Sequence, residues 1–308
     1  MVLCAGLGTR LRPLTEFVPK PACPVLNRPL VAYNFALLAG LGVRTVAINV
    51  HHLAERMTEV ARSEAAALHL GLHVSTEPVL LGTGGGLKAA EAWLAGDTFV
   101  LLNGDFVFDV DLPAALATHR RHGATATLVV QPMPAGESYR PLHARPDGTL
   151  ACLPGHPAPS GAQPWHFTGV HLLQPAIFAG LRSEPSGIFE TGYRHLLASG
   201  ARVQVHEDRG SWRDIGSPAQ LLAANLDAGA GLLPLARFSA LGPLRALSPE
   251  ADVGGLVEAS VVGPDALVPT GAQVRHSLVF AGTRLLPHEN LDGIVAAGSL
   301  RLSARHRA

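Results

Sequence analysis

The residues best suited to chemistry lie near the N-terminus, where a short apolar stretch runs into Gly6, Gly8 and Thr9 and two cations follow. Glycines directly after a strand let backbone N–H groups close around phosphate oxygens, since no Cβ blocks the approach. Arg10 and Lys20 then supply positive charge that can neutralise phosphoryl groups during transfer. The segment therefore predicts an anion-binding loop with two phosphate-binding cations.

This loop differs from two common phosphate-binding loops. A dinucleotide fingerprint G-x-G-x-x-G needs glycine at position 11, where Leu11 stands, and the Gly-Lys-Ser/Thr of a Walker A loop occurs nowhere in the chain. The alternative without a function is a Gly/Pro-rich turn after an edge strand.

Lysine usage singles out one cation. All but two of the 24 basic residues are arginine, and the exceptions are Lys20 and Lys88. A compact ammonium suits a phosphate oxygen reached through a narrow gap better than a planar guanidinium does. Lys20 stands between two prolines close to the glycine loop, so we interpret it as functional. Lys88 falls on an expected helix and is interpreted as a solvated side chain.

The elements that must position these residues alternate along the first hundred positions. Helices are expected at 29–40, 53–68 and 86–94, strands at 2–5, 45–50, 72–76 and 98–102, and a glycine loop at 82–86. Such alternation favours a doubly wound, mostly parallel α/β sheet with ligands at the carboxyl ends of its strands. The first strand looks short, as if one or two residues preceded it.

The later part of the chain changes texture twice. Residues 131–164 are rich in Pro, Gly and Ala and predict an irregular segment that covers or shapes a pocket. Strands at 167–173 and 202–206 and helices at 192–199 and 218–228 complete a first domain at 1–229. From 230 to 308, Val and Leu recur about every five or six residues, which resembles the hexapeptide repeat of a short left-handed parallel β-helix. The alternative is a Gly/Pro-rich tail with a few strands.

Composition narrows the class of protein. At 308 residues and 47% hydrophobic, the chain can bury the core of one large or two smaller domains. The formal charge is zero and no basic block occurs, so nucleic acid is not an expected partner. The three cysteines are too few for a disulfide framework and favour a reducing cytoplasm. No secretory signal and no membrane-spanning stretch are expected.

Residues 3–24 resemble the signature of the sugar-1-phosphate nucleotidyltransferases, roughly G-x-G-T-R-x-x-P-L-T followed by P-K-P. Further segments fit the same family, so the resemblance covers residues 2–229 and the tail, and implies a Rossmann-like nucleotidyltransferase domain. In that family a sugar 1-phosphate attacks the α-phosphorus of a nucleoside triphosphate (NTP), giving a nucleotide sugar and pyrophosphate. The protein positions the substrates and neutralises charge.

The resemblance implies roles for the matched residues. Arg10 would bind the β- and γ-phosphates and the leaving pyrophosphate, and Lys20 the attacking sugar phosphate and the α-phosphate. Asp105 and Asp214 would hold Mg²⁺, which keeps several waters and bridges to phosphates. Each aspartate alone could instead serve a turn.

Two further groups of residues follow from the family pattern. The nucleotide would contact Ala5, Gly6, Gly8, Thr9, Glu77, Gly82, Thr83 and Gly104. Thr168 and Gly169 would border the sugar, while Glu77 could equally be a surface charge at a strand end. A carboxylate there can accept from the N–H donors of guanine or of uracil, so the base stays open.

One departure leaves the sugar open as well. Many relatives carry a Glu-Lys-Pro element after a Tyr-Gly turn, which supplies a carboxylate to the sugar and a second lysine to its phosphate. Residues 139–164 contain neither. Either His143, Arg140 or Arg145 substitutes, or the sugar is held differently.

Several functions remain compatible with these motifs. The tail favours a mannose-1-phosphate guanylyltransferase type using GTP, and tails of this kind often mediate homo-oligomer assembly. The Thr-Gly-Gly-Gly run and the missing Glu-Lys-Pro favour a uridylyltransferase that uses UTP and N-acetylmuramate 1-phosphate. Asp109 and Asp111 form a D-x-D, which leaves a glycosyltransferase open, and a catalytically silent regulatory subunit is a third alternative.

Overall fold

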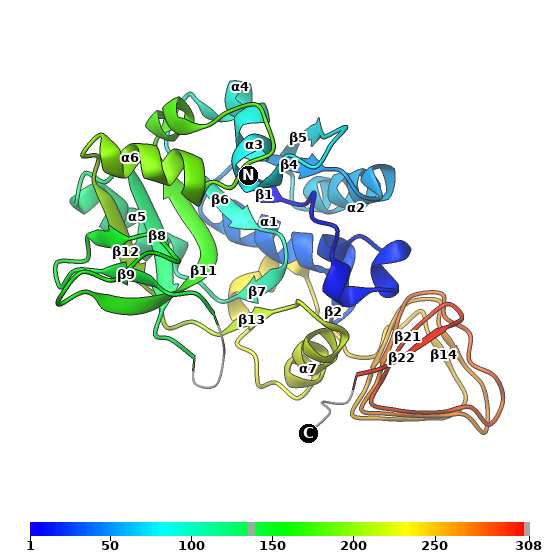
Figure 1. The fold of residues 1–308 in the computed structure, drawn as a ribbon. Coiled ribbons are helices and arrows are strands. Elements are labelled where there is room, and N and C mark those ends of the chain that lie inside the picture. The colour runs from blue at the N-terminus through cyan, green and yellow to red at the C-terminus, as the bar shows by residue number, and fades with distance from the viewer. Residues whose placement is uncertain (135–138, 305–308) are drawn as a thin grey trace.

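The computed structural model describes residues 1–134 and 139–304. An α/β unit built on a nine-stranded sheet forms the larger part, and a stack of short strands forms the C-terminal part (Figure 1). No helix in the described ranges has both the length and the apolar character needed to cross a membrane.

The centre of the sheet is parallel. β1 (Val2–Leu3) lies between β4 (Thr45–Val50) and β6 (Phe99–Asn103), and β5 (Gly71–Thr76) pairs with the far edge of β4. This arrangement confirms the predicted α/β class with a parallel centre. It also brings the carboxyl ends of β1, β4 and β6 together, which is where ligands bind in open α/β sheets.

Beyond β6 the sheet is mixed. β11 (Gln163–Leu173) runs antiparallel to β6 and to β8 (Ala126–Gln131), and β12 (Val203–Glu207) is parallel to β8. The segment 131–164, predicted to be irregular, contains β9 (Leu142–Ala144) and β10 (Leu150–Cys152). That prediction was wrong in part because its short apolar runs bury Leu142 and Leu150 between the prolines.

Helices cover both faces of this sheet. The helices are α1 (Leu30–Gly40), α2 (Ala54–Ala67), α3 (Gly82–Ala89), α4 (Glu91–Leu94), α5 (Leu112–Arg121), α6 (Arg194–Ala198) and α7 (Pro218–Gly229). Along β6, Val100 and Leu102 belong to one hydrophobic core and Phe99 and Leu101 to the other. Strand side chains alternate between faces, so two cores define the doubly wound arrangement.

The predicted glycine loop at 82–86 is the first part of helix α3. Glycine is a poor helix former, but the backbone of the segment 184–187 packs directly on this turn. An added Cβ would lie 2.7 Å from the Ser186 carbonyl oxygen at Gly82 and 2.4 Å from the Glu184 carbonyl oxygen at Gly85. These glycines are therefore required by close helix packing.

Two small pairs of strands complete the α/β unit. β2 (Pro24–Val25) and β3 (Arg28–Pro29) form a tight hairpin directly after the segment that carries Lys20. β7 (Phe106–Phe108) pairs antiparallel with β13 (Trp212–Asp214).

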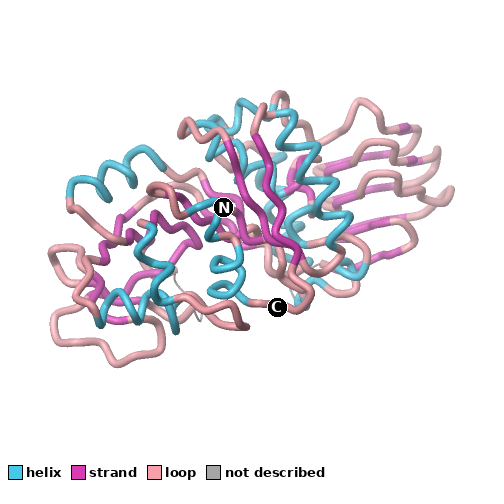
Figure 2. The backbone as a smooth tube through the Cα atoms, turned by 90° about the horizontal axis from the view of Figure 1, so that it is seen from above, coloured by secondary structure: helices cyan, strands magenta, loops and turns pink. Residues whose placement is uncertain are grey.

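Most of the C-terminal strands stack in parallel, and the step between paired strands is 17 residues from β15 onward. They are β14 (Asp252–Val253), β15 (Leu256–Glu258), β16 (Val261–Val262), β17 (Leu267–Val268), β18 (Gln273–Arg275), β19 (Leu278–Val279), β20 (Asn290–Asp292), β21 (Ile294–Ala297) and the antiparallel β22 (Leu300–Ser303). Val261 pairs with Leu278, and Leu278 with Val295, a constant step of 17 residues. These strands form turns of a coil, called the coils below (residues 252–303). The coils have a triangular outline in Figure 1 and lie in layers in Figure 2.

The linking segment (residues 230–251), which joins α7 to these coils, packs on the α/β unit. Within its 3₁₀ turn Ala236–Leu241, the Phe238 ring meets Tyr33 of α1 edge to face, with centroids 4.9 Å apart. The core that contains both rings continues into the coils through Val261 and Leu278. The coils are thus docked on the α/β unit by a shared apolar core.

Candidate active site

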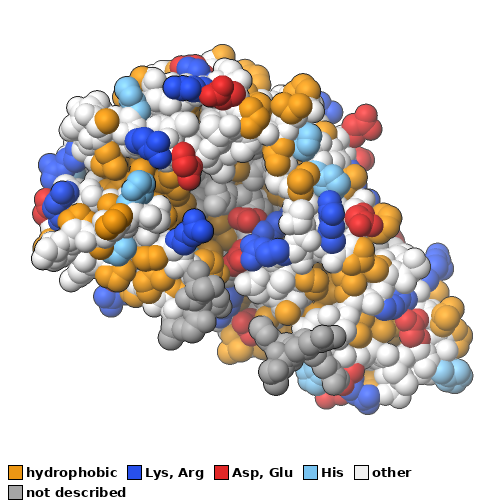
Figure 3. All heavy atoms as spheres, viewed as in Figure 1, with side chains coloured by type: hydrophobic (Ala, Val, Ile, Leu, Met, Phe, Trp, Pro, Cys, Tyr) orange, Lys and Arg blue, Asp and Glu red, His pale blue; other side chains and the backbone are white. Residues whose placement is uncertain are grey.

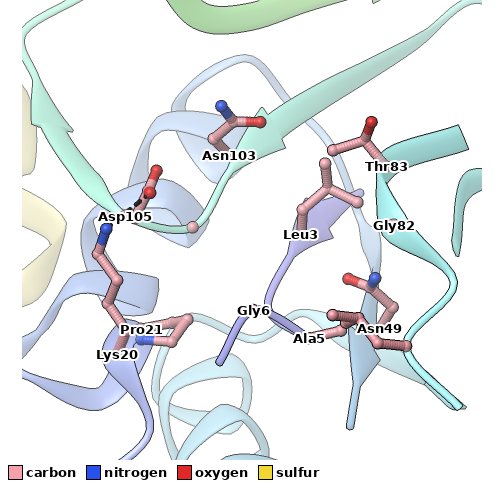
Figure 4. A pocket seen from close by; sticks show the side chains of 12 residues that line it. Leu3, Ala5, Gly6, Lys20, Pro21, Asn49, Gly82, Thr83, Asn103 and Asp105 are labelled. Carbon is pink, nitrogen blue, oxygen red and sulfur yellow. Dashed lines mark hydrogen bonds and ion pairs between the residues drawn. The ribbon is translucent and has the colours of Figure 1, made fainter. Parts of the chain in front are cut away.

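A cavity of about 270 Å³ opens at the carboxyl ends of β1, β4 and β6 (Figure 4). It is lined by Leu3, Ala5, Gly6, Lys20, Pro21, Asn49, Leu80, Gly82, Thr83, Asn103, Gly104 and Asp105. The structure thus brings the first loop, the start of α3 and the Asn-Gly-Asp turn around one cavity. The space-filling view shows this face hollowed, with basic and acidic side chains side by side near the hollow (Figure 3).

Two cation–carboxylate pairs form the charged side of the site. Lys20 Nζ donates to Asp105 Oδ2 at 2.8 Å, and Arg10 Nη2 lies 3.7 Å from Asp214 Oδ2. The ladder of β7 and β13 places the two aspartates together, because Asp214 pairs with Phe106 and the Ile215 N–H donates to the Asp105 carbonyl. The predicted cations and carboxylates therefore converge.

Burial divides these four side chains into an inner and an outer group. The side chains of Lys20 and Asp214 are each 11% exposed, against 66% for Arg10. Burial raises the pKa of Asp214 above its ordinary value, although the nearby Lys20 charge lowers it, and Asp105 adds to the rise. Asp214 is therefore a carboxylate whose charge is only partly compensated by its protein neighbours.

Glycines at two positions leave room for the cations. A Cβ on Gly216, after Asp214, would come within 2.6 Å of the Arg10 guanidinium. Gly8 has φ +59°, and a Cβ there would lie 2.8 Å from Thr15 Cγ2 and 3.3 Å from Lys20 Cβ. Gly6 faces open space. Gly8 and Thr9 lie beside the cavity and not in its lining, Thr9 at the start of a 3₁₀ turn.

Glu77 lies behind the cavity wall. It is 2% exposed; its Oε1 accepts from Asn49 Nδ2 at 2.7 Å and its Oε2 from the Leu81 N–H at 2.8 Å. Asn49 Oδ1 in turn accepts from the Cys4 N–H at 2.8 Å. Both carboxylate oxygens of Glu77 thus bond groups that hold the first loop and the start of α3, where the family pattern had suggested contact with the base.

The residues predicted to border the sugar lie at a bulge in β11. The register between β11 and β8 shifts between Phe167 and Val170. Thr168 is 1% exposed and its hydroxyl donates to the Val129 carbonyl, so this side chain is turned into the sheet. Gly169, with φ +89°, packs closely on Asn103, which lines the cavity.

None of the proposed substitutes for the Glu-Lys-Pro element lines the cavity. His143 Nδ1 lies 3.5 Å from Cys152 Sγ, and Arg145 donates to the Leu150 carbonyl, both within the hairpin of β9 and β10. Arg140 is exposed. The structure as described therefore offers no replacement for that element in the cavity wall.

The D-x-D aspartates belong to a different contact. Arg237, in the linking segment, lies 2.9 Å from Asp109 Oδ1 and 3.0 Å from Asp111 Oδ2. Asp111 also caps α5 by accepting from the Ala114 N–H. These two carboxylates therefore bind the linking segment to the α/β unit through Arg237. The D-x-D pair, which had suggested a glycosyltransferase, thus has a structural role.

The donor set suits a hard divalent cation. Within the described ranges, no group of three or more His, Cys, Asp or Glu side chains is arranged to hold a metal. Asp105 and Asp214 supply carboxylate oxygens only, and the charge on Asp214 is incompletely compensated. Two carboxylates with remaining positions for water and phosphate are what Mg²⁺ uses. The pair thus fits Mg²⁺ bound jointly with a phosphorylated substrate.

Several site residues were not predicted. Asn49 interrupts the apolar strand β4, and a lone amide in such a strand is the signal that could have revealed it. Leu3 and Leu80 line the cavity through apolar contacts that no motif distinguishes, and Pro21, although part of the P-K-P motif, had been given no role. Asn103 stands next to the predicted Gly104 and Asp105 and also lines the cavity (Figure 4).

The α/β unit that carries this cavity matches the nucleotidyl transferases. The chain belongs to the nucleotidyl transferase family, whose family model matches residues 1–230. The predicted family is therefore confirmed. A solved structure assigned as a glucose-1-phosphate thymidylyltransferase from Bacillus anthracis has a TM-score of 0.63 at 20% identity, covering 73% of this chain and 92% of that one. That likeness concerns the fold alone.

The similar curated proteins are sugar-1-phosphate nucleotidyltransferases. An N-acetylmuramate alpha-1-phosphate uridylyltransferase of Neisseria meningitidis is 31% identical over 75% of this chain and 98% of its own. A UTP–glucose-1-phosphate uridylyltransferase of Synechocystis is 28% identical over 94% and 85%. A mannose-1-phosphate guanyltransferase of Emericella nidulans is 28% identical over 72% of this chain, which spans only 62% of that relative.

Proposed function

We propose that this protein transfers a nucleoside monophosphate from an NTP to a sugar 1-phosphate and releases pyrophosphate. A mannose-1-phosphate guanylyltransferase-like enzyme is the first candidate. The observation that carries the proposal is the convergence of Lys20 with Asp105 and Arg10 with Asp214 beside a cavity lined by the first glycine loop. Family membership and the names of the curated relatives support it.

The reaction exchanges one phosphoanhydride bond for another. A phosphate oxygen of the sugar 1-phosphate bonds the α-phosphorus, and the bond from that phosphorus to the bridging oxygen of pyrophosphate breaks. Lys20 sits in the cavity wall, where its ammonium can hold the two approaching anions together. Arg10 is more exposed, and its guanidinium can neutralise the departing pyrophosphate.

Substrate binding must rearrange the two ion pairs. Each cation now faces one carboxylate, so the formal charges of the four side chains sum to zero. Asp105 and Asp214 would hold Mg²⁺, which supplies positive charge to the phosphate oxygens when it is bound. Lys20 and Arg10 are then free to turn from the carboxylates to the phosphates. The backbone at Gly6 faces open space, and Gly104 lines the same cavity.

A uridylyltransferase is the second candidate because specific observations favour it. The Neisseria relative is covered almost completely, and the chain shares with that type the absence of a Glu-Lys-Pro element. UTP with N-acetylmuramate 1-phosphate or another hexose 1-phosphate is therefore the alternative pair of substrates.

The remaining parts of the proposal concern the whole chain. Residues 1–229 would form the catalytic domain and residues 230–308 a left-handed parallel β-helix, in keeping with the parallel strands and the 17-residue step. This β-helix would join copies of the chain into a homo-oligomer. Cys4, Cys23 and Cys152 are all free, which agrees with a cytoplasmic enzyme of nucleotide-sugar synthesis.

The experiment is a pyrophosphate-release screen of the four common NTPs against a panel of sugar 1-phosphates with Mg²⁺. We expect release with GTP and mannose 1-phosphate, or with UTP and N-acetylmuramate 1-phosphate under the second candidate. Absence of release with every pair would contradict the proposed activity.

A further inference from the structure

We propose that Asn27 is a positioning residue through which the C-terminal coils hold the Lys20 segment in the active site. This inference rests on the proposed role of Lys20. Asn27 is at the tip of the β2–β3 hairpin. It lies seven residues after Lys20, and the hairpin follows the Lys20 segment directly. The coils contribute no residue to the cavity lining, so their influence on the site must pass through such a contact.

The hairpin tip is built to present this side chain. Leu26 and Asn27 both have positive φ, 44° and 64°, which is the backbone of a two-residue hairpin turn of the type that favours asparagine. Asn27 Nδ2 donates to the carbonyls of Arg245 and Val262, each at 3.0 Å, and lies 3.4 Å from that of Ala246. One amide thus binds the end of the linker and the first coil together.

The carbonyls that accept from Asn27 lie where the linking segment meets the first strands of the coils. Val262 in β16 donates to the Ala246 carbonyl at 2.8 Å, and its own carbonyl accepts from the Ser248 N–H at 2.9 Å. Asn27 therefore bonds a backbone pairing that is already fixed within the C-terminal part.

The opposite side of the hairpin is fixed as well. Asn225 of α7 accepts from the Leu26 N–H and donates to the Pro24 carbonyl, at 3.0 and 2.8 Å. Arg28 donates to the Leu241 carbonyl of the linking segment at 2.9 Å. The hairpin is held between α7, the linker and the coils.

Hydrogen bonds carry this constraint back to Lys20. The Leu30 N–H donates to the Cys23 carbonyl and the Cys23 N–H to the Lys20 carbonyl, at 3.1 and 3.0 Å. Elsewhere a cavity of about 570 Å³ separates the segment from the coils, with Leu14 and Phe17 on one side and Phe280 and Gly298 on the other. Because that space is open, the hydrogen bond at the hairpin tip is the one that joins the described coil residues to this segment.

The test measures how fast an amine-reactive acylating reagent modifies Lys20 relative to Lys88, by mass spectrometry of the full chain. These are the only two lysines, so Lys88 is an internal reference. Asn27→Gly keeps the positive φ and removes the amide, and Asn27→Asp replaces its donors by an acceptor facing carbonyls. We expect the Lys20 to Lys88 ratio to rise about threefold or more in both, because the segment opens locally.

His69→Gly is the matched control, since His69 also has positive φ (55°) and is exposed. It should leave the ratio unchanged. In pyrophosphate release, the Asn27 variants should raise the KM for the sugar 1-phosphate more than the KM for the NTP. An unchanged ratio in Asn27→Asp, or an equal rise at both lysines, overturns the inference. A wild-type chain that releases no pyrophosphate overturns the proposed function instead, and the labelling ratio still decides the role of Asn27.

Discussion

At the scale of single residues, the site depends on two cations and two carboxylates that compensate one another. Of the four, Lys20 is the strongest indication of a functional site, because its side chain is nearly buried and it is one of only two lysines. Its position after the glycine loop could be seen in the sequence, and this position predicted that Lys20 is a phosphate-binding cation. That its resting partner is Asp105 was not, because the pairing depends on how the turn after β6 folds back.

Lys20→Ala should lower pyrophosphate release by about 100- to 1,000-fold, the loss typical when one preorganised charge is removed from a transfer site. Lys88→Ala is the control, because Lys88 is not among the residues that line the cavity and pairs with Glu91 at 2.6 Å. Its activity should stay within about twofold of the wild type, as expected when a surface ion pair is lost. Equal effects of the two substitutions would remove the special role of Lys20.

Asp214→Asn should separate stability from activity. Burial raises the pKa of Asp214, so the folded chain binds this proton more tightly than the unfolded chain does. The stability that the protonated form contributes is present at low pH and is lost as the pH rises through the raised pKa. At pH 7 without Mg²⁺, the Tm of the variant should therefore be up to about 2 °C above that of the wild type. Its turnover, measured with Mg²⁺, should fall about 100-fold.

The pH dependence supplies the check on Asp214. The Tm advantage of Asp214→Asn should shrink as the pH is lowered toward the ordinary range of aspartate, because the wild-type carboxyl then becomes neutral too. Thermal scans between about pH 4 and pH 8 measure it. A variant that is less stable than the wild type by the same amount at every pH would show that Asp214 acts through another contact.

At the scale of elements, the glycine-rich turn of α3 is positioned by a buried polar network. Glu77 and Asn49 link the first loop to the start of this helix. Gly82 and Thr83, which the motif predicts to contact the nucleotide, line the cavity, but their segment had been described as a loop. The error is physical: glycines there permit close packing on residues 184–187, a contact between segments a hundred positions apart that no local pattern contains.

Gly86→Ala tests this packing. A Cβ at Gly86 would lie 2.6 Å from Glu77 Oε1 and 2.7 Å from Asn49 Nδ2. Alanine is the better helix former by up to about 1 kcal/mol, yet overpacking should prevail and destabilise the fold by about 1–3 kcal/mol. Gly96→Ala is the control, since nothing lies within 4 Å of its Cβ position. Urea denaturation compares the two; a stabilised Gly86→Ala chain would contradict the close contact.

At the scale of the whole molecule, the parallel sheet centre was predictable because each strand there is a short apolar run between helix patterns. The antiparallel β11 was less so, since it pairs with β6 and β8, which lie far from it in the sequence. The recurrence of Val and Leu predicted the stacked coils. Their docking on the α/β unit through Phe238 and Asn27 could be seen only in three dimensions.

The coils carry exposed apolar side chains that bear on assembly. Leu286 is 71% exposed, and Leu232, in the linking segment, is 68% exposed. If the coils form the proposed interface, Leu286→Glu should shift the chain from oligomer to monomer by placing a charge in an apolar contact, whereas Leu232→Glu should not. Sedimentation velocity distinguishes these states. A wild-type chain that is monomeric at micromolar concentration would contradict assembly through the coils.

The most direct measurement of the central claim follows both products of one reaction. The purified chain is incubated with Mg²⁺, the NTP and the sugar 1-phosphate selected by the screen, and ³¹P NMR records pyrophosphate and nucleotide sugar together. We predict that the two products form in equal amounts and only when both substrates are present, and that Lys20→Ala forms both about 100- to 1,000-fold more slowly. Phosphate or pyrophosphate released from the NTP alone, without a nucleotide sugar, would contradict the assignment of this site to nucleotidyl transfer.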